Sequence, residues 1–253
     1  MTARRWAILL EYDGAGFVGW QTQAAGLAIQ TIVENAVSLL AGGPVACVTA
    51  GRTDAGVHAL GQVVHFDLER EIEPAKLVQA LNFHTKPHRV VALRAVVVPD
   101  DWSARFSATG RAYRYVILNR RARPGLEAGR VWHLPQALDA AAMAAGARHL
   151  LGRHDFTSFR AAACQAKSPM RTLDRLDVTR HGDVIEIVAE ARSFLHHQVR
   201  NMVGTLKFIG EGRWAPDVTA EILAAADRSR AGPTAPPEGL FLTAVRYAPT
   251  VFD

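Results

Sequence analysis

Hydrophobic and polar positions in the first part of the chain alternate between the period of a strand and that of a helix. The run "RWAILLEYDG" is strand-like and ends at Asp-Gly, whereas "AIQTIVENAVSLLAGG" spaces its apolar residues at helical intervals and stops at glycine. The helical face is predicted to contain Ile29, Ile32, Val33, Ala36, Val37 and Leu40. Two more strands, a short helix and a buried strand are predicted, in turn, at "PVACVTAG", "ALGQVVHFDLE", "EPAKLVQALN" and "RVVALRAVVVPD". The order β-α-β-β-α-β is that of a ferredoxin-like unit.

The second part of the chain repeats this order in a looser form. A strand is predicted at "GRAYRYVILNR", and a hairpin with a glycine in its turn at "RTLDRLDVTRHGDVIEIVAEAR". Three helices and a final strand are predicted, in turn, at "PQALDAAAMAAGARHLLG", "SFLHHQVRNMVGTLKFIG", "APDVTAEILAAAD" and "GLFLTAVRYA". The loop Arg120–Arg130 is rich in arginine, proline and glycine, and "RAGPTAPPEG" is expected to be a surface loop. We therefore expect an α+β fold of two halves, residues 1–105 and 106–253.

Composition favours a globular protein in a reducing, cytoplasmic setting. Hydrophobic residues make up 49% of the chain and charged residues 21%, which is ample for a core. The early apolar run "WAILL" is too short for a membrane span and is followed at once by Glu11 and Asp13, unlike a signal peptide. Cys47 and Cys164 fit neither a disulfide framework nor a metal-binding CxxC pair.

The basic charge is carried almost entirely by arginine. The formal net charge is +5, and only four of the 29 basic residues are lysine. Guanidinium groups bind phosphate through two hydrogen bonds and stack on bases, so this bias suits an RNA or DNA partner. A chain rich in alanine and arginine through codon composition would show the same bias, and charge alone leaves both explanations open.

The stretch "TAGRTDAGVHALGQ" contains a candidate catalytic acid. Gly51 and Gly56 flank Asp54, and Arg52 lies two residues before it. In extended chain residues two apart point the same way, so Arg52 could keep Asp54 ionised as a nucleophile or base. The alternative is a structural turn in which the aspartate bonds its own backbone.

Two further segments combine arginine with aromatic or small residues. In "FSATGRAYRY", alternation places Arg111, Tyr113 and Tyr115 on one strand face and Arg114 on the other, which favours either base stacking or ordinary cross-strand packing. The helix beginning near Ser193 is predicted to have two stripes. Its core stripe is Val199, Met202, Val203 and Leu206, and its second stripe is His197, Arg200, Asn201 and Gly204.

No complete cofactor motif is present in the sequence. It has no phosphate-binding P-loop, no GxSxG elbow and no aromatic signature of an RNA recognition motif. Gly14, Gly16 and Gly19 have the spacing GxGxxG after the first predicted strand, but the next helix is predicted only from "AIQTIVENAVSLLAGG", so no nucleotide cofactor is implied. The adjacent His196 and His197 are expected to point in different directions, and zinc is not expected because no further ligand lies at helical spacing.

Taken together, six motifs resemble one family, the TruA tRNA pseudouridine synthases. They are "LEYDGAGFVGWQ", "AGRTDAGVHA", "RFSATGRAYRY", "DFTSFR", "FLHHQVRNMVG" and "EGLFLTAV". Because they are spread along the sequence, the resemblance covers nearly the whole chain. The resemblance implies a pseudouridine synthase fold, with two ferredoxin-like halves joined in one mixed sheet with a cleft between them. It also implies isomerisation of uridine at tRNA positions 38, 39 and 40, a homodimer that holds tRNA across both subunits, and no cofactor or metal.

The resemblance also implies roles for particular residues. Asp54 corresponds to the catalytic nucleophile and Tyr113 to the substrate-binding tyrosine. Arg200 would pair with Asp54, Leu240 would line the base pocket, and Arg52 would assist in flipping the nucleotide. The family therefore gives to Arg200 the ion pair that spacing alone suggested for Arg52.

The chain departs from the family pattern at Gln198, where methionine is frequent, and in the segment Asn82–Val90. Neither departure involves the implied nucleophile. Two alternatives remain beside the isomerase. An RNA chaperone would bind RNA without covalent chemistry, and a glycoside hydrolase would need a second acid about 5–9 Å from the first.

Overall fold

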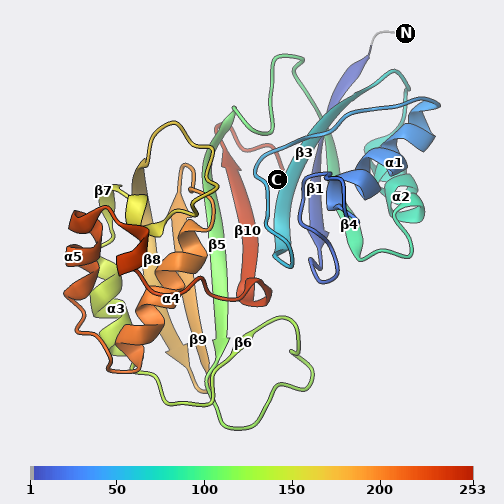
Figure 1. Cartoon of the computed structure of the whole chain (residues 1–253). Helices are drawn as coiled ribbons and strands as arrows, with labels where there is room; N and C mark the ends of the chain where they lie inside the picture. The colour runs from blue at the N-terminus through green and yellow to red at the C-terminus, as the bar shows by residue number, and fades with distance from the viewer. Residues whose placement is uncertain (1–2, 253) are drawn as a thin grey trace. The chain divides into compact units, whose positions relative to one another are not determined.

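The computed structural model describes residues 3–252, which form two compact units (Figure 1). The first unit runs to Gly110 and takes in the chain again from Phe241, and the second comprises Arg111–Leu240. Among the described residues, no helix is both long enough and apolar enough to cross a membrane.

The first unit contains the sheet predicted from the sequence. Strands β4 (Val90–Val98), β1 (Arg4–Tyr12) and β3 (His58–Leu68) lie side by side in that order and are antiparallel. The two-residue strand β2 (Val48–Thr49) is antiparallel to β3. The order β4-β1-β3-β2 is that of a ferredoxin-like unit, in which the two crossovers place the first and third strands at the centre.

The last strand of the chain, β10 (Leu240–Tyr247), joins the first unit from Phe241 onward. It pairs in parallel with β3, where Phe241 lies opposite His58, so the sheet is mixed. The observed units therefore differ from the expected halves 1–105 and 106–253 in where the end of the chain belongs. Local periodicity identifies a strand, but its pairing partner lies far away in the sequence.

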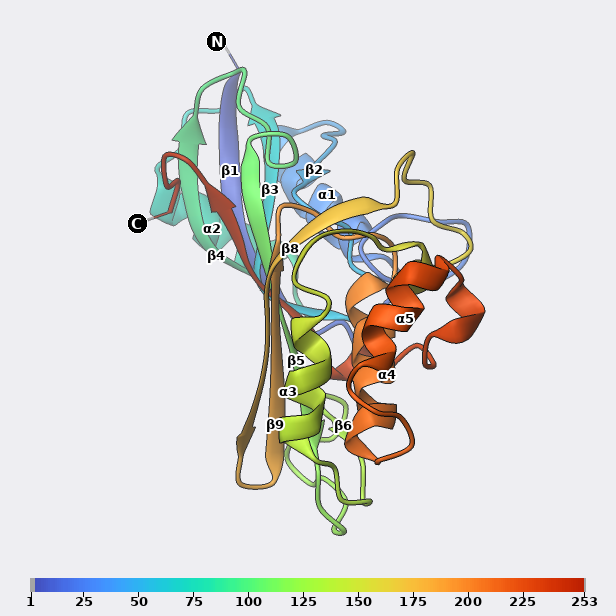
Figure 2. The ribbon, with the colours of Figure 1, turned by 90° about the vertical axis from the view of Figure 1, so that its left-hand side faces the viewer.

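Two helices cover one face of the first sheet, α1 (Ile29–Ala41) and α2 (Pro74–His84), as Figures 1 and 2 show. Helix α1 ends because Gly42 adopts a left-handed φ of 75° and donates its N–H to Ser38. Its predicted apolar face is buried except for Leu40, which is partly exposed. The same unit contains a further cluster of buried residues, drawn from strands and from the segments between them, which comprises Ala50, Val63, Ala104, Ala108 and Tyr247.

The four longer strands of the second unit pair in an antiparallel arrangement. Its strands lie in the order β5 (Ala108–Leu118, in this unit from Arg111), β9 (Val184–Ala191), β8 (Met170–His181) and β7 (Gly152–Asp155). The short strand β6 (Trp132–His133) pairs in parallel with β5. The predicted hairpin is the pair β8 and β9, whereas β6 and β7 gave no clear signal in the sequence.

Helices α3 (Ala140–Arg148) and α4 (Gln198–Gly210) pack side by side on one face of this second sheet (Figure 2). Asp139 caps α3 by accepting from two backbone N–H groups of its first turn. Helix α5 (Val218–Ala225) and the 3-10 turns η1 (Thr157–Phe159), η2 (Arg228–Arg230) and η3 (Pro237–Gly239) complete the unit. In chain order β5, α3, β8, β9 and α4 repeat the β-α-β-β-α pattern, and β10, which belongs to the first unit from Phe241 onward, is the strand that follows them. The α+β prediction is confirmed.

Three local predictions in this unit are wrong. Helix α4 begins at Gln198 and not near Ser193, because His197 precedes it with a left-handed φ of 62°. The rings of His196 and His197 do not diverge, since their centroids lie 4.0 Å apart. The "RAGPTAPPEG" segment is not simply a surface loop, because Gly232, Ala235 and Gly239 are buried in it.

Candidate active site

The loop that carries Asp54 is a tight turn. The Val57 N–H donates to the Asp54 carbonyl over 3.1 Å, and Gly56 supplies a φ of 76° at the third position of the turn. The turn expected from "TDAG" therefore exists in the backbone. Asp54 itself is half-buried and Arg52 is exposed, so the carboxylate is neither sealed in the core nor fully solvated.

Buried hydrogen bonds hold the residues just before Asp54. The Thr53 hydroxyl lies 2.8 Å from the Tyr12 hydroxyl, and the Gln62 side-chain amide donates to Tyr12 over 3.2 Å and to the Gly51 carbonyl over 2.7 Å. Burial raises the pKa of Tyr12 to about 12, so its hydroxyl stays protonated and can donate to Thr53 at neutral pH. These hydrogen bonds fix the backbone that leads into the turn.

A second segment, from the "LEYDGAGFVGWQ" motif, packs against the same turn. The Trp20 N–H donates to the Thr53 carbonyl over 3.0 Å, and the Gly14 N–H donates to His58 Nδ1 over 3.0 Å. Gly19 has a φ of 105°, and a Cβ placed there would lie 2.7 Å from the Thr53 carbonyl oxygen. Two motifs that are far apart in the sequence therefore form one rigid support for Asp54.

In the second unit, strand β5 presents one accessible tyrosine. Tyr113 is half-buried and meets Phe194 edge to face, with ring centroids 5.2 Å apart. Tyr115 is fully buried, its hydroxyl donates to the Pro236 carbonyl over 2.8 Å, and burial raises its pKa. Of the two alternatives left open for the face of Arg111, Tyr113 and Tyr115, ordinary packing therefore holds for Tyr115, which is a structural anchor.

Helix α4 contributes Arg200, which is half-buried. Its Nε donates to the Ala235 carbonyl over 2.7 Å, and the Ala235 N–H donates back to the Arg200 carbonyl over 3.1 Å. Leu240 begins β10, directly after η3, and is 5% exposed. Asn201 and Gly204, predicted on a polar stripe with Arg200, are buried and face the segment that contains Ala235.

The five predicted site residues are divided between the two units. Asp54 and Arg52 belong to the first unit, and Tyr113, Arg200 and Leu240 belong to the second. The pairing of Asp54 with Arg200 and the roles of all five residues stay predictions.

The two departures from the family pattern have structural roles. Gln198 is 1% exposed and accepts from the Leu195 N–H over 2.9 Å, at the start of α4. The Asn82 side chain bonds both the N–H and the carbonyl of Ala92, over 2.7 Å and 2.9 Å, and so ties α2 to β4. Both residues therefore satisfy backbone groups.

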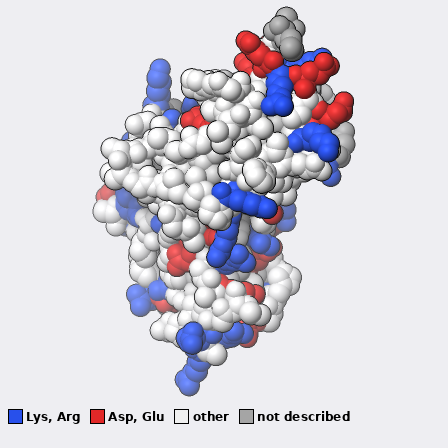
Figure 3. Space-filling model, turned by 90° about the vertical axis from the view of Figure 1, so that its right-hand side faces the viewer, with Lys and Arg blue, Asp and Glu red and all other residues white. Residues whose placement is uncertain are grey.

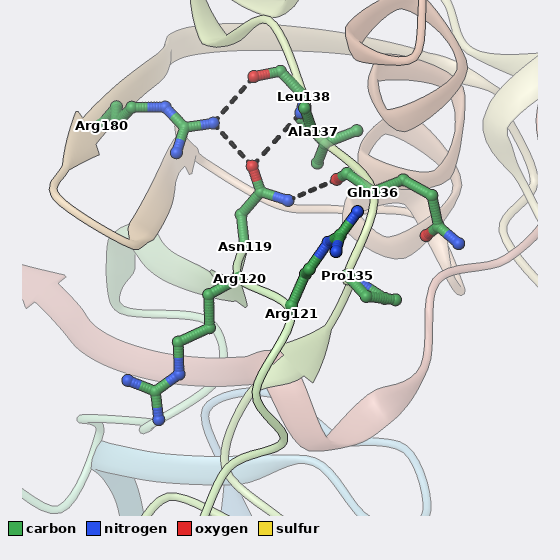
Figure 4. A pocket seen from close by; sticks show the side chains of 8 residues that line it. All are labelled: Asn119, Arg120, Arg121, Pro135, Gln136, Ala137, Leu138 and Arg180. Atoms are coloured by element: carbon green, nitrogen blue, oxygen red, sulfur yellow. Dashed lines mark hydrogen bonds between the residues drawn. The ribbon is translucent and has the colours of Figure 1, made fainter.

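An open pocket in the second unit contains several arginines. Arg180 donates to the Asn119 side-chain oxygen over 2.7 Å and to the Leu138 carbonyl over 2.8 Å. In Figure 4 the guanidinium groups of Arg120, Arg121 and Arg180 point in different directions, so the pocket does not converge on one anion. Separate charges of this kind suit an extended polyanion better than a small one.

Charged side chains are spread over the face that Figure 3 shows. On the face that Figure 3 shows, lysine and arginine side chains stand in separate groups, some of them beside aspartate or glutamate. The net charge of +5 is thus not gathered into one continuous patch on that face.

Comparison with known proteins points to one enzyme class. A sequence model of a family described as tRNA pseudouridine synthase matches residues 8–107 and 146–248. A tRNA pseudouridine synthase A of Acidiphilium cryptum is 63% identical over 246 residues, which cover 96% of both chains. The proteins of the same name from Paramagnetospirillum magneticum and Gluconobacter oxydans are 60% and 54% identical, covering 96% and 98% of this chain and 95% and 92% of their own.

Proposed function

The chain belongs to the tRNA pseudouridine synthase family, and from that premise we propose that it isomerises uridines 38, 39 and 40 of the tRNA anticodon stem-loop with Asp54 as its single catalytic carboxylate. The observation that carries this proposal is the turn at Asp54. A half-buried carboxylate stands on a turn that is held by Tyr12, Gln62 and Trp20. Such support restricts where the carboxylate can go, which catalysis at a positioned substrate requires.

The isomerisation of uridine needs few catalytic groups. The bond from uracil N1 to ribose C1′ breaks, a bond from C5 to C1′ forms, C5 loses a proton and N1 gains one. Composition and oxidation state do not change, so neither a hydrolytic pair of acids nor a redox cofactor is needed. One ionised carboxylate is sufficient, whether it adds to the sugar or the uracil or removes a sugar proton.

The target base must leave its stack before Asp54 can reach it. Unstacking and unpairing cost a few kcal/mol, which contacts to the everted nucleotide offset. We assign the stacking contact to Tyr113, whose ring is accessible, and the apolar wall to Leu240. Arg200 would keep Asp54 ionised, and the exposed Arg52 would support the flipped nucleotide.

The proposed partner is the anticodon arm of tRNA, bound by a homodimer in the cytoplasm. Arginine supports the RNA part of this proposal, because 25 of the 29 basic residues, all but the four lysines, carry guanidinium groups. The exposed loop Arg120–Arg130 adds several of these groups at one place in the second unit.

Site mapping tests the proposal. Tritium is placed at uridine C5 of tRNA transcripts that carry uridine at only one of positions 38, 39 and 40, and release is measured together with primer extension after carbodiimide treatment. We expect label release and a carbodiimide-dependent stop at each of the three positions. Modification of uridines outside the anticodon stem-loop, with none at these positions, would refute the proposed specificity, and binding without any modification would favour the RNA chaperone.

A further inference from the structure

The segment 231–240 follows α4 closely instead of forming an exposed loop. Besides its two bonds between Ala235 and Arg200, it is held further along the helix at Thr205. The Thr205 hydroxyl accepts from the Gly232 N–H over 2.9 Å and donates to the Asn201 carbonyl over 2.9 Å. Thr205 is fully buried, so these two bonds have no competition from water.

Close backbone packing adds to these bonds. The Pro233 carbonyl lies against the Cα of Gly204, so near that any Cβ at residue 204 would overlap it. Gly232 likewise packs against the backbone of Thr205, with 2.7 Å between a Cβ built at residue 232 and the Thr205 Cα. Glycine at both positions thus allows the segment to touch the helix backbone.

Arg228 joins the start of the segment to α4. Its guanidinium donates to the Gly232 carbonyl over 2.9 Å, to Asn201 Oδ1 over 3.1 Å and to the Thr234 hydroxyl over 3.3 Å. Thr234 in turn donates to Asn201 Oδ1 over 2.7 Å. These acceptors are all neutral, and burial lowers the pKa of Arg228, as expected for a guanidinium used as a structural fork.

The far end of the segment is fixed to strand β5. The Tyr115 hydroxyl donates to the Pro236 carbonyl over 2.8 Å, and Gly239 packs on the Tyr115 ring, where a Cβ would lie 2.7 Å from ring atoms. Leu240 follows directly, and Tyr113 is two residues before Tyr115 on the same strand. The segment therefore connects two predicted site residues, Arg200 and Leu240, and is anchored to the strand that carries a third, Tyr113.

We propose that Thr205 and Arg228 are positioning residues, which hold segment 231–240 and through it set the guanidinium of Arg200 and the side chain of Leu240. This inference rests on the proposed function of that site. Neither residue needs to touch RNA for this role. Their replacement should therefore slow the chemical step while leaving RNA binding nearly unchanged.

The test compares two buried threonines of the same unit. Thr205→Val keeps the shape of the side chain but leaves the Gly232 N–H without its acceptor. Thr219→Val is the matched control, because Thr219 is also fully buried but donates to Gly146 and Pro216, away from segment 231–240. We expect both variants to lower Tm by similar amounts.

Kinetics then separates positioning from general stability. We expect Thr205→Val to lower kcat about tenfold or more with KM within about twofold, and Thr219→Val to leave both within about twofold. Thr205→Ser restores the hydroxyl and should restore kcat. Arg228→Lys, which keeps the charge but loses the fork, is measured as a second variant in case Thr205→Val does not fold. Equal kcat values for the two valine variants, or for Arg228→Lys and the wild type, would overturn the inference.

Hydrogen exchange provides a readout that does not depend on activity. Thr205→Val should accelerate amide exchange at Gly232 and Ala235, whereas Thr219→Val should not. If the wild type forms no pseudouridine, the proposed function fails, and the exchange result still decides on the segment. Unchanged exchange at both amides would show that Thr205 does not hold it.

Discussion

Gly19→Ala should impair catalysis although Gly19 takes no part in the reaction, because Gly19 lies against the turn that carries Asp54. The new Cβ would be 2.7 Å from the Thr53 carbonyl oxygen and 3.0 Å from the Ala55 nitrogen. Ordinary contact begins near 3.4 Å, so the turn must move by roughly 0.7 Å, and the atoms that must move are backbone atoms held by hydrogen bonds. A misplacement of about 1 Å can cost about 10²-fold in rate.

The matched control is Gly16→Ala in the same motif. Gly16 has a φ of 82°, close to the 105° of Gly19, but a Cβ there meets nothing within 4 Å. Both substitutions place alanine at positive φ, which costs about 1–2 kcal/mol and lowers Tm by about 2–4 °C for each kcal/mol. Only Gly19→Ala adds the collision with the turn.

The assay is single-turnover formation of pseudouridine in an anticodon stem-loop, with Tm measured in parallel. We expect the rate of Gly19→Ala to fall by between about 10-fold and 10²-fold, and that of Gly16→Ala to stay within about twofold of wild type. If Gly19→Ala turns over at the wild-type rate, or if Gly16→Ala is equally slow, then catalysis does not depend on the close packing of Gly19 against the turn at Asp54.

Three further predictions follow from other interactions. Tyr12→Phe removes the hydroxyl that bonds the buried side chains of Thr53 and Gln62, and it should lower the free energy of unfolding by about 1–3 kcal/mol, measured by urea denaturation. An unchanged free energy of unfolding would contradict these hydrogen bonds. Arg5 donates two hydrogen bonds of 2.8 Å to Asp67 and so lowers the pKa of that carboxyl in the folded protein. The stabilisation from this ion pair is therefore fully present above the unfolded pKa of about 3.9, and it is lost as the pH falls through the lower folded pKa. Asp67→Asn should therefore be less stable than wild type at pH 7 by Tm, with the difference shrinking below about pH 4, and a gap independent of pH would contradict the ion pair. Replacing Arg121 and Arg123 by alanine should reduce the slope of log Kd for tRNA against log salt concentration by about one for each phosphate that the variant no longer binds. An unchanged slope would show that this loop does not contact the RNA backbone.

Much of the fold could be predicted from the sequence because its signals are local. Helical spacing from Ile29 to Val37, ended by Gly42, defines α1, and the apolar run at residues 6–10, followed by Asp13 and Gly14, marks β1. The return of β10 to the first unit could not be predicted, because it depends on pairing with His58 and Ala59 far back in the chain.

In the candidate site, too, local motifs could be predicted from the sequence and contacts between distant segments could not. The motif around Asp54 is recognisable, but the hydrogen bonds of Tyr12 and Gln62 with its turn depend on strands that meet only in the folded sheet. The surface loop that the sequence predicts for "RAGPTAPPEG" is wrong for a physical reason. Its proline and glycine content is typical of surface loops, but here buried side chains of α4, such as Thr205, satisfy its backbone.

The account depends most directly on the carboxylate of Asp54, and Asp54→Asn tests it with almost no change of shape. Pseudouridine formation and RNA affinity are measured on the same anticodon stem-loop for the variant and the wild type. We predict that Asp54→Asn forms no detectable pseudouridine. Its Kd for the RNA should stay within about threefold of wild type, because contacts between arginine side chains and phosphates dominate affinity and Asp54 makes none of them. Pseudouridine formation by the variant at a rate near that of the wild type would contradict the assignment of Asp54 as the catalytic residue.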